Sequence, residues 1–277
     1  MRQMVAKAPG WAPAWKLLAD ALLAAGDAGG ARSPYEAVVG LDPDGALGAK
    51  LDLARLGALA PQEAMQAGYV AALFDDYADR FEAHLTRVLA YSGPRSILEA
   101  VRELRAAAGR DFRFAHALDL GSGTGLMGEA IRPHAVALCG VDLSPLMVAR
   151  ARAKLVYDRL VVGELREFLQ GDETRFDLVL AADVLCYVGD LPALFCAVAA
   201  RLEPHGLFAF TLQAAPPETP EGFTLGADNR FAHSANYVVA TAVASGLRLA
   251  HLAQAAIRQE AGRDVPGFVA VLEWRGG

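Results

Sequence analysis

The 277-residue sequence predicts an α/β fold, in which a seven-stranded, mostly parallel and doubly wound sheet follows an α-helical N-terminal segment. Short apolar runs alternate with amphipathic helical patterns from about residue 93 onwards, which is typical of a parallel sheet. The first of these runs enters a glycine-rich turn. The first 60 residues carry only helical patterns. We therefore expect a helical segment over 1–60, a further helix over 61–92 and the sheet domain over 93–277.

The stretch ALDLGSGTGLMG at 117–128 predicts a short buried strand, a tight turn and the start of a helix. Glycines let the backbone approach a ligand closely, and the free N–H groups of a helix N-terminus favour negative charge. The last three glycines have the spacing G-x-G-x-x-G of dinucleotide-binding turns. The first three alternate as G-x-G-x-G and follow Asp119. This acid favours a cofactor with cationic groups, because a carboxylate repels a pyrophosphate.

The second pattern resembles the D/E-x-G-x-G-x-G turn of class I S-adenosylmethionine-dependent methyltransferases. The resemblance implies S-adenosylmethionine as the cofactor and S-adenosylhomocysteine as the product. The order of the expected strands also resembles the Rossmann-like fold of that class, from about residue 93 to the end. In the turn, the residues that we expect to bind the cofactor are Asp119, Gly121, Ser122 and Gly123.

An acid follows each of the next three strands expected after the glycine turn. Asp142 lies 21 residues after Gly121, close to the ~20-residue spacing of an acid that binds ribose hydroxyls. Glu164 follows the third strand, where the resembled family contacts the adenine amino group. Asp183 follows the fourth strand. Further cofactor contacts are expected from Leu143, Met147, Leu165 and Ala182.

The helix expected over 62–91 carries an aromatic stripe at helical spacing. It resembles the F-D-x-Y-A-x-x-F segment of small-molecule methyltransferases, whose N-terminal helices cover the cofactor. The Tyr77 ring is expected to contact the sulfonium through a cation–π interaction. Arg80 and His84, about one helical turn apart, are expected to face the substrate.

The residues after the fourth strand usually face the methyl group in the resembled family, so Asp183 and Tyr187 are candidate acceptor contacts. Arg230 lies in a later loop and could bind a substrate carboxylate. His233, expected in the same loop, has a side chain whose pKa suits a general base. We therefore predict Tyr187 and His233 as catalytic residues and Asp183 and Arg230 as substrate residues.

The absence of certain motifs also limits which molecules can be the methyl acceptor. The Asn/Asp-Pro-Pro-aromatic tetrad of nucleic-acid amino-methyltransferases and the Pro-Cys pair of cytosine-C5 enzymes do not occur after the fourth strand. The net charge is −6 and no Lys/Arg cluster occurs, which argues against a nucleic-acid substrate. The sequence therefore predicts methyl transfer to an oxygen, nitrogen or carboxylate of a small or carrier-bound molecule.

Residues 12–43 resemble a tetratricopeptide repeat: two expected helices, each with one apolar face, are joined by a Gly-Asp turn. Ser33 and Pro34 are expected to start the second helix, as its N-cap and first residue. The whole chain thus resembles a group of bacterial methyltransferases with an N-terminal tetratricopeptide segment. This segment is expected to pack against the rest of the chain, or to bind a protein partner or a second copy.

Composition limits the remaining possibilities. No apolar run reaches the ~18 residues of a membrane span, and the N-terminus has no signal-peptide core. The three cysteines form no C-x-x-C pair and the histidines show no metal-ligand spacing, so we expect no metal and a reducing cytoplasm. Two alternatives stay open: a non-catalytic module that binds S-adenosylmethionine and a partner, and an NAD(P)-dependent oxidoreductase.

Overall fold

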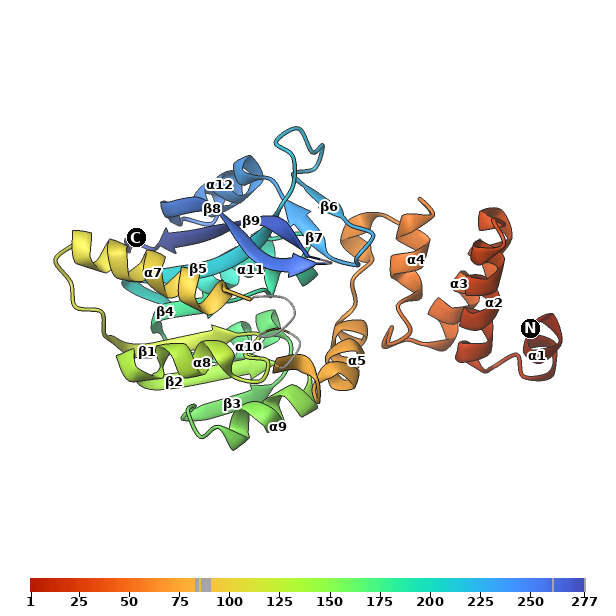
Figure 1. Cartoon of the computed structure of the whole chain (residues 1–277), viewed down its shortest axis with the longest axis horizontal. Coiled ribbons are helices and arrows are strands. Elements are labelled where there is room, and N and C mark those ends of the chain that lie inside the picture. Colours follow the sequence, from red (N-terminus) through yellow and green to blue (C-terminus); the bar gives the residue numbers. More distant parts are fainter. Residues whose placement is uncertain (83–84, 86–90, 261, 277) are drawn as a thin grey trace. The chain divides into compact units, whose positions relative to one another are not determined.

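The computed structural model describes residues 1–82, 85, 91–260 and 262–276 (Figure 1). The chain forms two compact units. The helical unit comprises Met1–Leu73 with Ala227–Asn229, and the sheet unit comprises Phe74–Gly226 with Arg230–Gly277. The boundary therefore falls within one helix, α5 (Ala67–Tyr77).

The helical unit is built from short helices. They are α1 (Arg2–Lys7), α2 (Ala12–Ala24), α3 (Ala28–Leu41), α4 (Ala49–Arg55), the 3₁₀ turn η1 (Pro61–Glu63) and the first part of α5. The expected start at Ser33 is wrong, because Asp27 caps α3 earlier: its carboxylate accepts a hydrogen bond from Gly30 N at 2.8 Å. Pro34 consequently lies inside the helix.

Small side chains let α2 and α3 pack closely around Ala19, Ala31 and Tyr35, which are fully buried. The Tyr35 hydroxyl donates to Asp20 Oδ1 at 2.8 Å. Lys16 joins the same carboxylate to that of Asp52, at 2.6 and 3.1 Å. The unit thus has its own apolar core and its own charge network.

The sheet unit contains a mostly parallel sheet in the order β3-β2-β1-β4-β5, extended beyond β5 by an antiparallel β9–β8 hairpin (Figure 1). This arrangement confirms the predicted Rossmann-like α/β fold. The strands are β1 (Phe114–Leu120), β2 (Ala135–Asp142), β3 (Arg159–Val162), β4 (Phe176–Ala181), β5 (Leu202–Ala214), β8 (Arg248–Glu260) and β9 (Arg263–Glu273).

A small hairpin of β6 (Phe223–Leu225) and β7 (Phe231–His233) adds two strands to the predicted seven. β7 pairs in parallel with the end of β5, where Ala214 lies beside His233. The loop that was expected around Arg230 and His233 therefore contains a strand, β7. Three-residue strands show no alternation of apolar and polar residues, and the prolines between 216 and 220 conceal them further.

Helices cover both faces of the sheet, as a doubly wound fold requires. One apolar core packs α10 (Leu165–Gly171), α11 (Pro192–Ala199) and α12 (Ala235–Ala244) against the strands. The other packs α7 (Gly93–Ala107) and α8 (Leu126–Ile131). α9 (Pro145–Ala153) follows β2 and is capped by Ser144, whose hydroxyl accepts from Met147 N at 3.0 Å. The parallel strands end at one edge of the sheet, so the segments after β1, β2 and β4 meet there.

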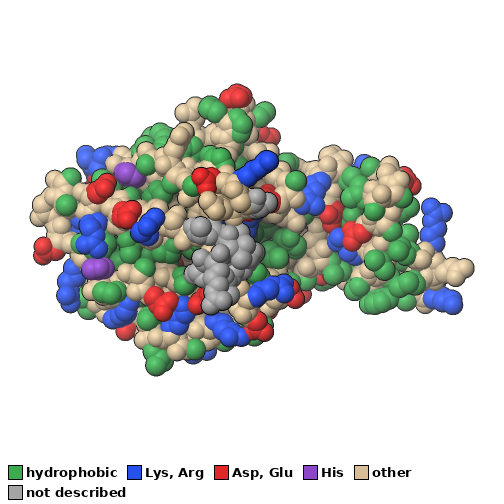
Figure 2. All heavy atoms as spheres, viewed as in Figure 1, with side chains coloured by type: hydrophobic (Ala, Val, Ile, Leu, Met, Phe, Trp, Pro, Cys, Tyr) green, Lys and Arg blue, Asp and Glu red, His purple; other side chains and the backbone are tan. Residues whose placement is uncertain are grey.

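Figure 2 shows one face of the molecule. Basic and acidic side chains of the described residues are interspersed over it. Hydrophobic side chains gather over the helical unit, where Trp11, Leu17 and Leu41 are exposed by 51%, 46% and 39%.

Candidate functional site

The glycine turn after β1 adopts a backbone that favours glycine at alternate positions. The φ angles of Gly121, Gly123 and Gly125 are +69°, +51° and +94°. Gly121 N and Ser122 N both donate to Val141 O, at 2.8 and 3.0 Å, which holds the turn against β2. A Cβ at Gly121 would lie 2.4 Å from Cγ2 of Val184, so the segment after β4 also lies against the turn.

Asp142 ties the turn to α9. Its Oδ2 accepts from Gly123 N at 2.8 Å and its Oδ1 from Ser144 N at 2.9 Å. Burial raises the pKa of Asp142, and the bonds from Ser144 and Gly123 oppose that rise. A carboxylate has about four acceptor positions, so Asp142 retains capacity for the hydroxyls of a ribose.

Asp119 is fully buried behind the turn. Its Oδ2 accepts from the Tyr157 hydroxyl at 2.6 Å. Burial raises its pKa to about 7, against the lowering effect of the Tyr157 bond, and the nearby Asp142 charge adds to the rise. Among the described residues, Asp119 Oδ1 and the Ser122 hydroxyl are buried without a hydrogen-bond partner.

The unpartnered atoms of the turn indicate which part of the implied cofactor it could bind. A buried polar atom without a partner usually marks a place where a ligand or water completes the bonding. Asp119 Oδ1, a carboxylate oxygen without a partner, suits an ammonium group. The residues present therefore fit the amino-acid end of S-adenosylmethionine, and Asp142 suits its ribose.

The other predicted cofactor residues are distributed around this turn. Glu164 caps α10: its Oε2 accepts from Arg166 N at 2.8 Å and Glu167 N at 2.9 Å. The Met147 side chain is fully buried beneath α9, whereas its backbone N–H completes the helix cap. Leu165 is buried, and Leu143 and Ala182 are half-buried.

The C-terminal end of α5 and the turn after it form a lid segment, residues 74–82, whose aromatic rings lie edge to face. The Phe81 ring centroid is 5.3 Å from that of Tyr77 and 5.9 Å from that of Phe74. Phe81 Cε1 lies 3.6 Å from where a Cβ of Gly123 would stand. Phe81 therefore contacts the glycine turn directly, and the predicted contact of Tyr77 with the sulfonium stays a prediction.

The predicted substrate residues of this segment differ in their surroundings. Arg80 is exposed, forms an ion pair with Asp76 at 2.8 Å and lies 5.6 Å from the Tyr77 ring. His84 lies outside the described residues.

Acidic side chains attach the lid segment to α9 and its cap. They occur at 75, 79 and 82, a spacing that places them along one side of the segment. Asp75 accepts from the Ser144 hydroxyl and from Leu146 N, Asp79 pairs with Arg150, and Glu82 pairs with Lys154 at 2.6 Å.

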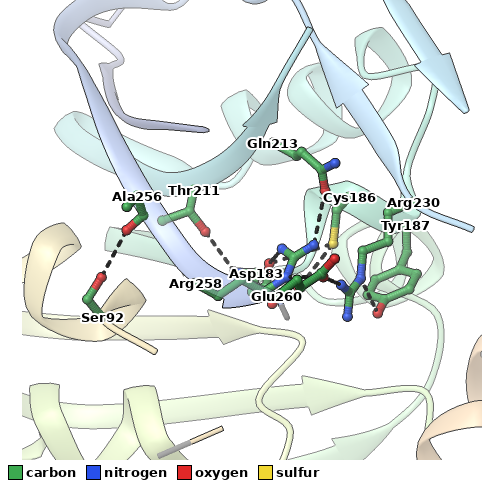
Figure 3. A network of polar contacts seen from close by, with 10 residues as sticks. All are labelled: Ser92, Asp183, Cys186, Tyr187, Thr211, Gln213, Arg230, Ala256, Arg258 and Glu260. Carbon is green, nitrogen blue, oxygen red and sulfur yellow. Dashed lines mark hydrogen bonds and ion pairs between the residues drawn. The ribbon is translucent and has the colours of Figure 1, made fainter. Parts of the chain in front are cut away.

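A second polar cluster lies at the end of β4, and we call it the acceptor network. Figure 3 shows Arg258 of β8 between the side chains that it bonds. This guanidinium is fully buried and donates to Glu260 at 2.8 Å, Asp183 at 3.0 Å and Gln213 at 3.1 Å. Asp183 has φ +59°, and its N–H donates to the Thr211 hydroxyl at 2.8 Å. Arg258 and Thr211 therefore hold an otherwise unfavourable turn after β4.

Arg230 extends the network to Tyr187. It donates to Glu260 Oε1 at 2.5 Å and to the Tyr187 hydroxyl at 3.1 Å, and its Cζ lies 5.8 Å from the Tyr187 ring. The structure thus brings together three of the predicted residues, Asp183, Tyr187 and Arg230. Sequence reasoning missed Arg258 and Glu260, because they lie on a distant hairpin strand that carries no motif.

His233 does not lie in an open loop, and its surroundings disfavour the predicted role of general base. It belongs to β7, is fully buried, and its Nε2 lies 3.1 Å from Gly189 O. Its ring is stacked on Tyr237 with centroids 6.0 Å apart. Burial lowers the pKa of His233 to about 4, which makes it a weak base at neutral pH.

No three His, Cys, Asp or Glu side chains of the described residues are placed to hold a metal ion. Within the same part of the chain, no helix has the length and apolar character needed to cross a membrane.

Known methyltransferases are similar to this chain in sequence. A family model described as a methyltransferase domain matches residues 90–256. A ubiquinone biosynthesis O-methyltransferase from Xanthomonas oryzae pv. oryzae is 32% identical over 155 residues, which cover 53% of this chain and 63% of the relative. One from Coxiella burnetii is 30% identical over 99 residues, covering 35% and 42%. The chain therefore matches less than two thirds of the length of these relatives.

Solved structures share the fold. An S-adenosylmethionine-dependent methyltransferase from Clostridium acetobutylicum superposes with a TM-score of 0.54 at 17% identity, covering 74% of this chain and 100% of that one. An N-methyltransferase from Bradyrhizobium japonicum in complex with S-adenosylhomocysteine gives 0.53 at 19% identity, covering 73% and 100%.

The fold and the glycine-turn site define a class I S-adenosylmethionine-dependent methyltransferase. The chain belongs to the methyltransferase-domain family, and its cofactor is S-adenosylmethionine. This outcome favours the D/E-x-G-x-G-x-G resemblance over the dinucleotide pattern. Gly128, the last glycine of that pattern, leaves room for the Tyr157 ring, because a Cβ there would lie 2.3 Å from the ring.

Proposed function

We propose that this chain transfers the methyl group of S-adenosylmethionine to an oxygen of a small or carrier-bound molecule. One observation carries the proposal: Val184 lies against Gly121, which brings the segment after β4, with Asp183 and Tyr187, beside the cofactor turn. The curated relatives named as O-methyltransferases support oxygen as the acceptor atom. Nitrogen and carboxylate acceptors are the competing outcomes of the test.

The cofactor supplies a methyl group that its sulfonium already activates. The chain must hold the acceptor in line with the methyl–sulfur bond and exclude water. Asp119, the glycine turn and Asp142 would hold the cofactor. The lid segment covers the turn through Phe81, which contributes to excluding water.

An acceptor hydroxyl needs a proton acceptor if it reacts near neutral pH. With His233 buried, the acceptor network offers the carboxylates of Asp183 and Glu260. Glu260 Oε1 accepts from both Arg258 and Arg230, and although burial favours a higher pKa, these cations keep it low. We therefore assign the proton to Asp183 and the orientation of the acceptor to Tyr187 and Arg230.

The test is an acceptor screen with S-adenosylmethionine, in which the formation of S-adenosylhomocysteine is measured for phenols, alcohols, carboxylic acids and amines. We expect turnover with hydroxyl compounds. The Asp183→Asn variant should lose turnover and keep cofactor binding, since Asp183 lies in the acceptor network and not on the cofactor turn. Turnover only with amines would overturn the oxygen assignment. Binding without turnover of any class would favour a non-catalytic module.

The helical unit would contribute packing or partner contacts and no chemistry. Its exposed Trp11, Leu17 and Leu41 offer apolar surface, which suits a protein partner or a second copy. The tetratricopeptide resemblance suits the same role. Deleting residues 1–60 should leave cofactor binding intact while changing oligomeric state or solubility. Loss of binding in a deletion variant that stays folded would place the unit in the active site.

A further inference from the structure

Tyr157 lies between α9 and β3, directly behind the glycine turn. Its ring occupies space that glycines leave open: a Cβ at Gly128 would stand 2.3 Å from its Cζ, and one at Gly140 would stand 2.8 Å from its Cε1. A Cβ at Gly125 would come within 3.2 Å of its Cε2. The ring position is therefore fixed by the backbone of three neighbouring segments.

This position delivers the Tyr157 hydroxyl to Asp119. The hydroxyl donates to Oδ2 at 2.6 Å, and burial raises the pKa of Tyr157 far enough that it stays a protonated donor. Asp119 Oδ1 is buried and has no hydrogen-bond partner among the described residues. One carboxylate oxygen is thus held, and the other is left for a ligand.

We propose that Tyr157 is a positioning residue for cofactor binding, which holds Asp119 by Oδ2 so that Oδ1 receives the cationic amino group of S-adenosylmethionine. The proposal rests on S-adenosylmethionine as the cofactor. It adds to the glycine turn a residue that never touches the cofactor itself. Tyr157 acts through the carboxylate, by fixing its orientation and by favouring its ionised form.

The charges around Asp119 predict how cofactor affinity should change with pH. Burial raises the pKa of Asp119 to about 7, the Asp142 charge raises it further, and the Tyr157 bond lowers it. Tyr91 and Cys139 also lie close enough to interact with Asp119. An ammonium group binds the carboxylate and not the acid. Cofactor affinity should therefore be low below pH 7 and rise as the pH passes through the pKa of Asp119.

Removing the Tyr157 hydroxyl removes the contribution that lowers this pKa. The Tyr157→Phe variant keeps the ring that packs on the glycines. The midpoint of its curve of cofactor affinity against pH should therefore move to higher pH. Below the midpoint, affinity should fall about tenfold for each pH unit by which the midpoint moves. At a pH well above both midpoints the pH-dependent part of the difference should disappear, and the loss that remains measures the orientation of Asp119 by Tyr157.

The experiment measures the dissociation constant of S-adenosylhomocysteine by calorimetry from pH 5.5 to 9 for the wild-type chain, Tyr157→Phe and Asp119→Asn. Methylthioadenosine, which lacks the amino group, is the second probe. We expect the midpoint to rise in Tyr157→Phe, the step assigned to Asp119 to vanish in Asp119→Asn, and the difference between Tyr157→Phe and wild type to vanish with methylthioadenosine. Comparing proteins with one probe cancels the titration of the probe itself.

Other outcomes would overturn the proposal. A loss in Tyr157→Phe that is equal at every pH and persists with methylthioadenosine would mean that Tyr157 only supports packing. An unchanged curve would mean that Asp119 needs no help from it. Failure of the wild-type chain to bind either probe would refute the cofactor and this role together, whereas failure of the acceptor screen alone leaves this role intact.

Discussion

The cofactor side and the acceptor side of the site are built in different ways. On the cofactor side, the glycine turn and Asp142 are joined by bonds to backbone N–H groups. Within the described residues, Asp119 Oδ1 and the Ser122 hydroxyl there lack a partner. On the acceptor side, the charged side chains bond to one another. That network comprises Asp183, Tyr187, Gln213, Arg230, Arg258 and Glu260.

This difference indicates what each side needs. A buried polar atom without a partner costs about 1–3 kcal/mol, so a ligand that satisfies it gains affinity. In the acceptor network, the guanidinium groups of Arg230 and Arg258 are paired with the carboxylates of Asp183 and Glu260. Substitutions should therefore weaken binding on the cofactor side and folding on the acceptor side.

The largest effect is expected from Arg258→Met. The change leaves Asp183 and Glu260 without their shared cation, and breaking a buried ion pair costs about 3–5 kcal/mol. We expect a loss of about 3 kcal/mol in the free energy of unfolding, because Glu260 remains 38% exposed to water. Chemical denaturation measures this loss.

The matched control for Arg258→Met is Arg263→Met, an exposed arginine on the same hairpin. It should be close to wild type. Equal stability of both variants would contradict the idea that the acceptor network stabilises the fold.

A smaller effect, on binding, is expected from Asp142→Ala. The variant loses the carboxylate that holds Gly123 N and that would bind the ribose, so affinity for S-adenosylmethionine and its product should fall by about 1–3 kcal/mol. Calorimetry with S-adenosylhomocysteine measures it. Asp111→Ala, an exposed acid before β1, is the control. An unchanged dissociation constant would remove Asp142 from the ribose role.

Asp142 lies where sequence reasoning placed it, at the end of β2 beside the glycine turn. The strand, glycine turn and following acid are close in sequence, because a βα unit places them together through local geometry. Gly121 and Asp142 could therefore be placed by spacing alone.

The acceptor side could not be predicted in the same way. Arg258 and Asp183 are 75 residues apart, and only the pairing of β8, β9 and β5 brings them together. His233 looked like a loop base because the three-residue strand β7 is too short to show a pattern, and its burial depends on Phe223 and Tyr237. Long-range pairing and burial are properties of the folded chain, which one sequence does not display.

The lid segment offers a test within the cofactor side. Phe81→Ala should weaken the binding of S-adenosylmethionine and its product equally, because Phe81 contacts the glycine turn and not a charge. Tyr77→Ala should cost about 0.5–2 kcal/mol for the sulfonium cofactor alone, if its ring meets the sulfonium. Tyr77→Phe, which keeps the ring, is the control. If Tyr77→Ala weakens both ligands equally, Tyr77 contributes shape and no cation–π attraction.

The smallest effect concerns the ion pairs that attach the lid segment to α9. Asp79 pairs with Arg150, and both side chains are largely exposed, by 85% and 54%. Exposed ion pairs contribute about 0.2–1 kcal/mol and are screened by salt. Asp79→Asn should therefore weaken S-adenosylhomocysteine binding slightly at low salt and leave it unchanged at high salt.

The matched control for Asp79→Asn is Asp76→Asn. Asp76 lies on the same segment and is equally exposed, but its ion pair is with Arg80 within the segment and not with α9. If both variants lost the same affinity, the general charge of the segment would matter and not its attachment. If only Asp79→Asn responded, with a loss that disappears as salt rises, the attachment to α9 would contribute to binding. The cofactor side would then depend on surface charges as well as on the buried turn, unlike the acceptor side, where the central guanidinium is fully buried.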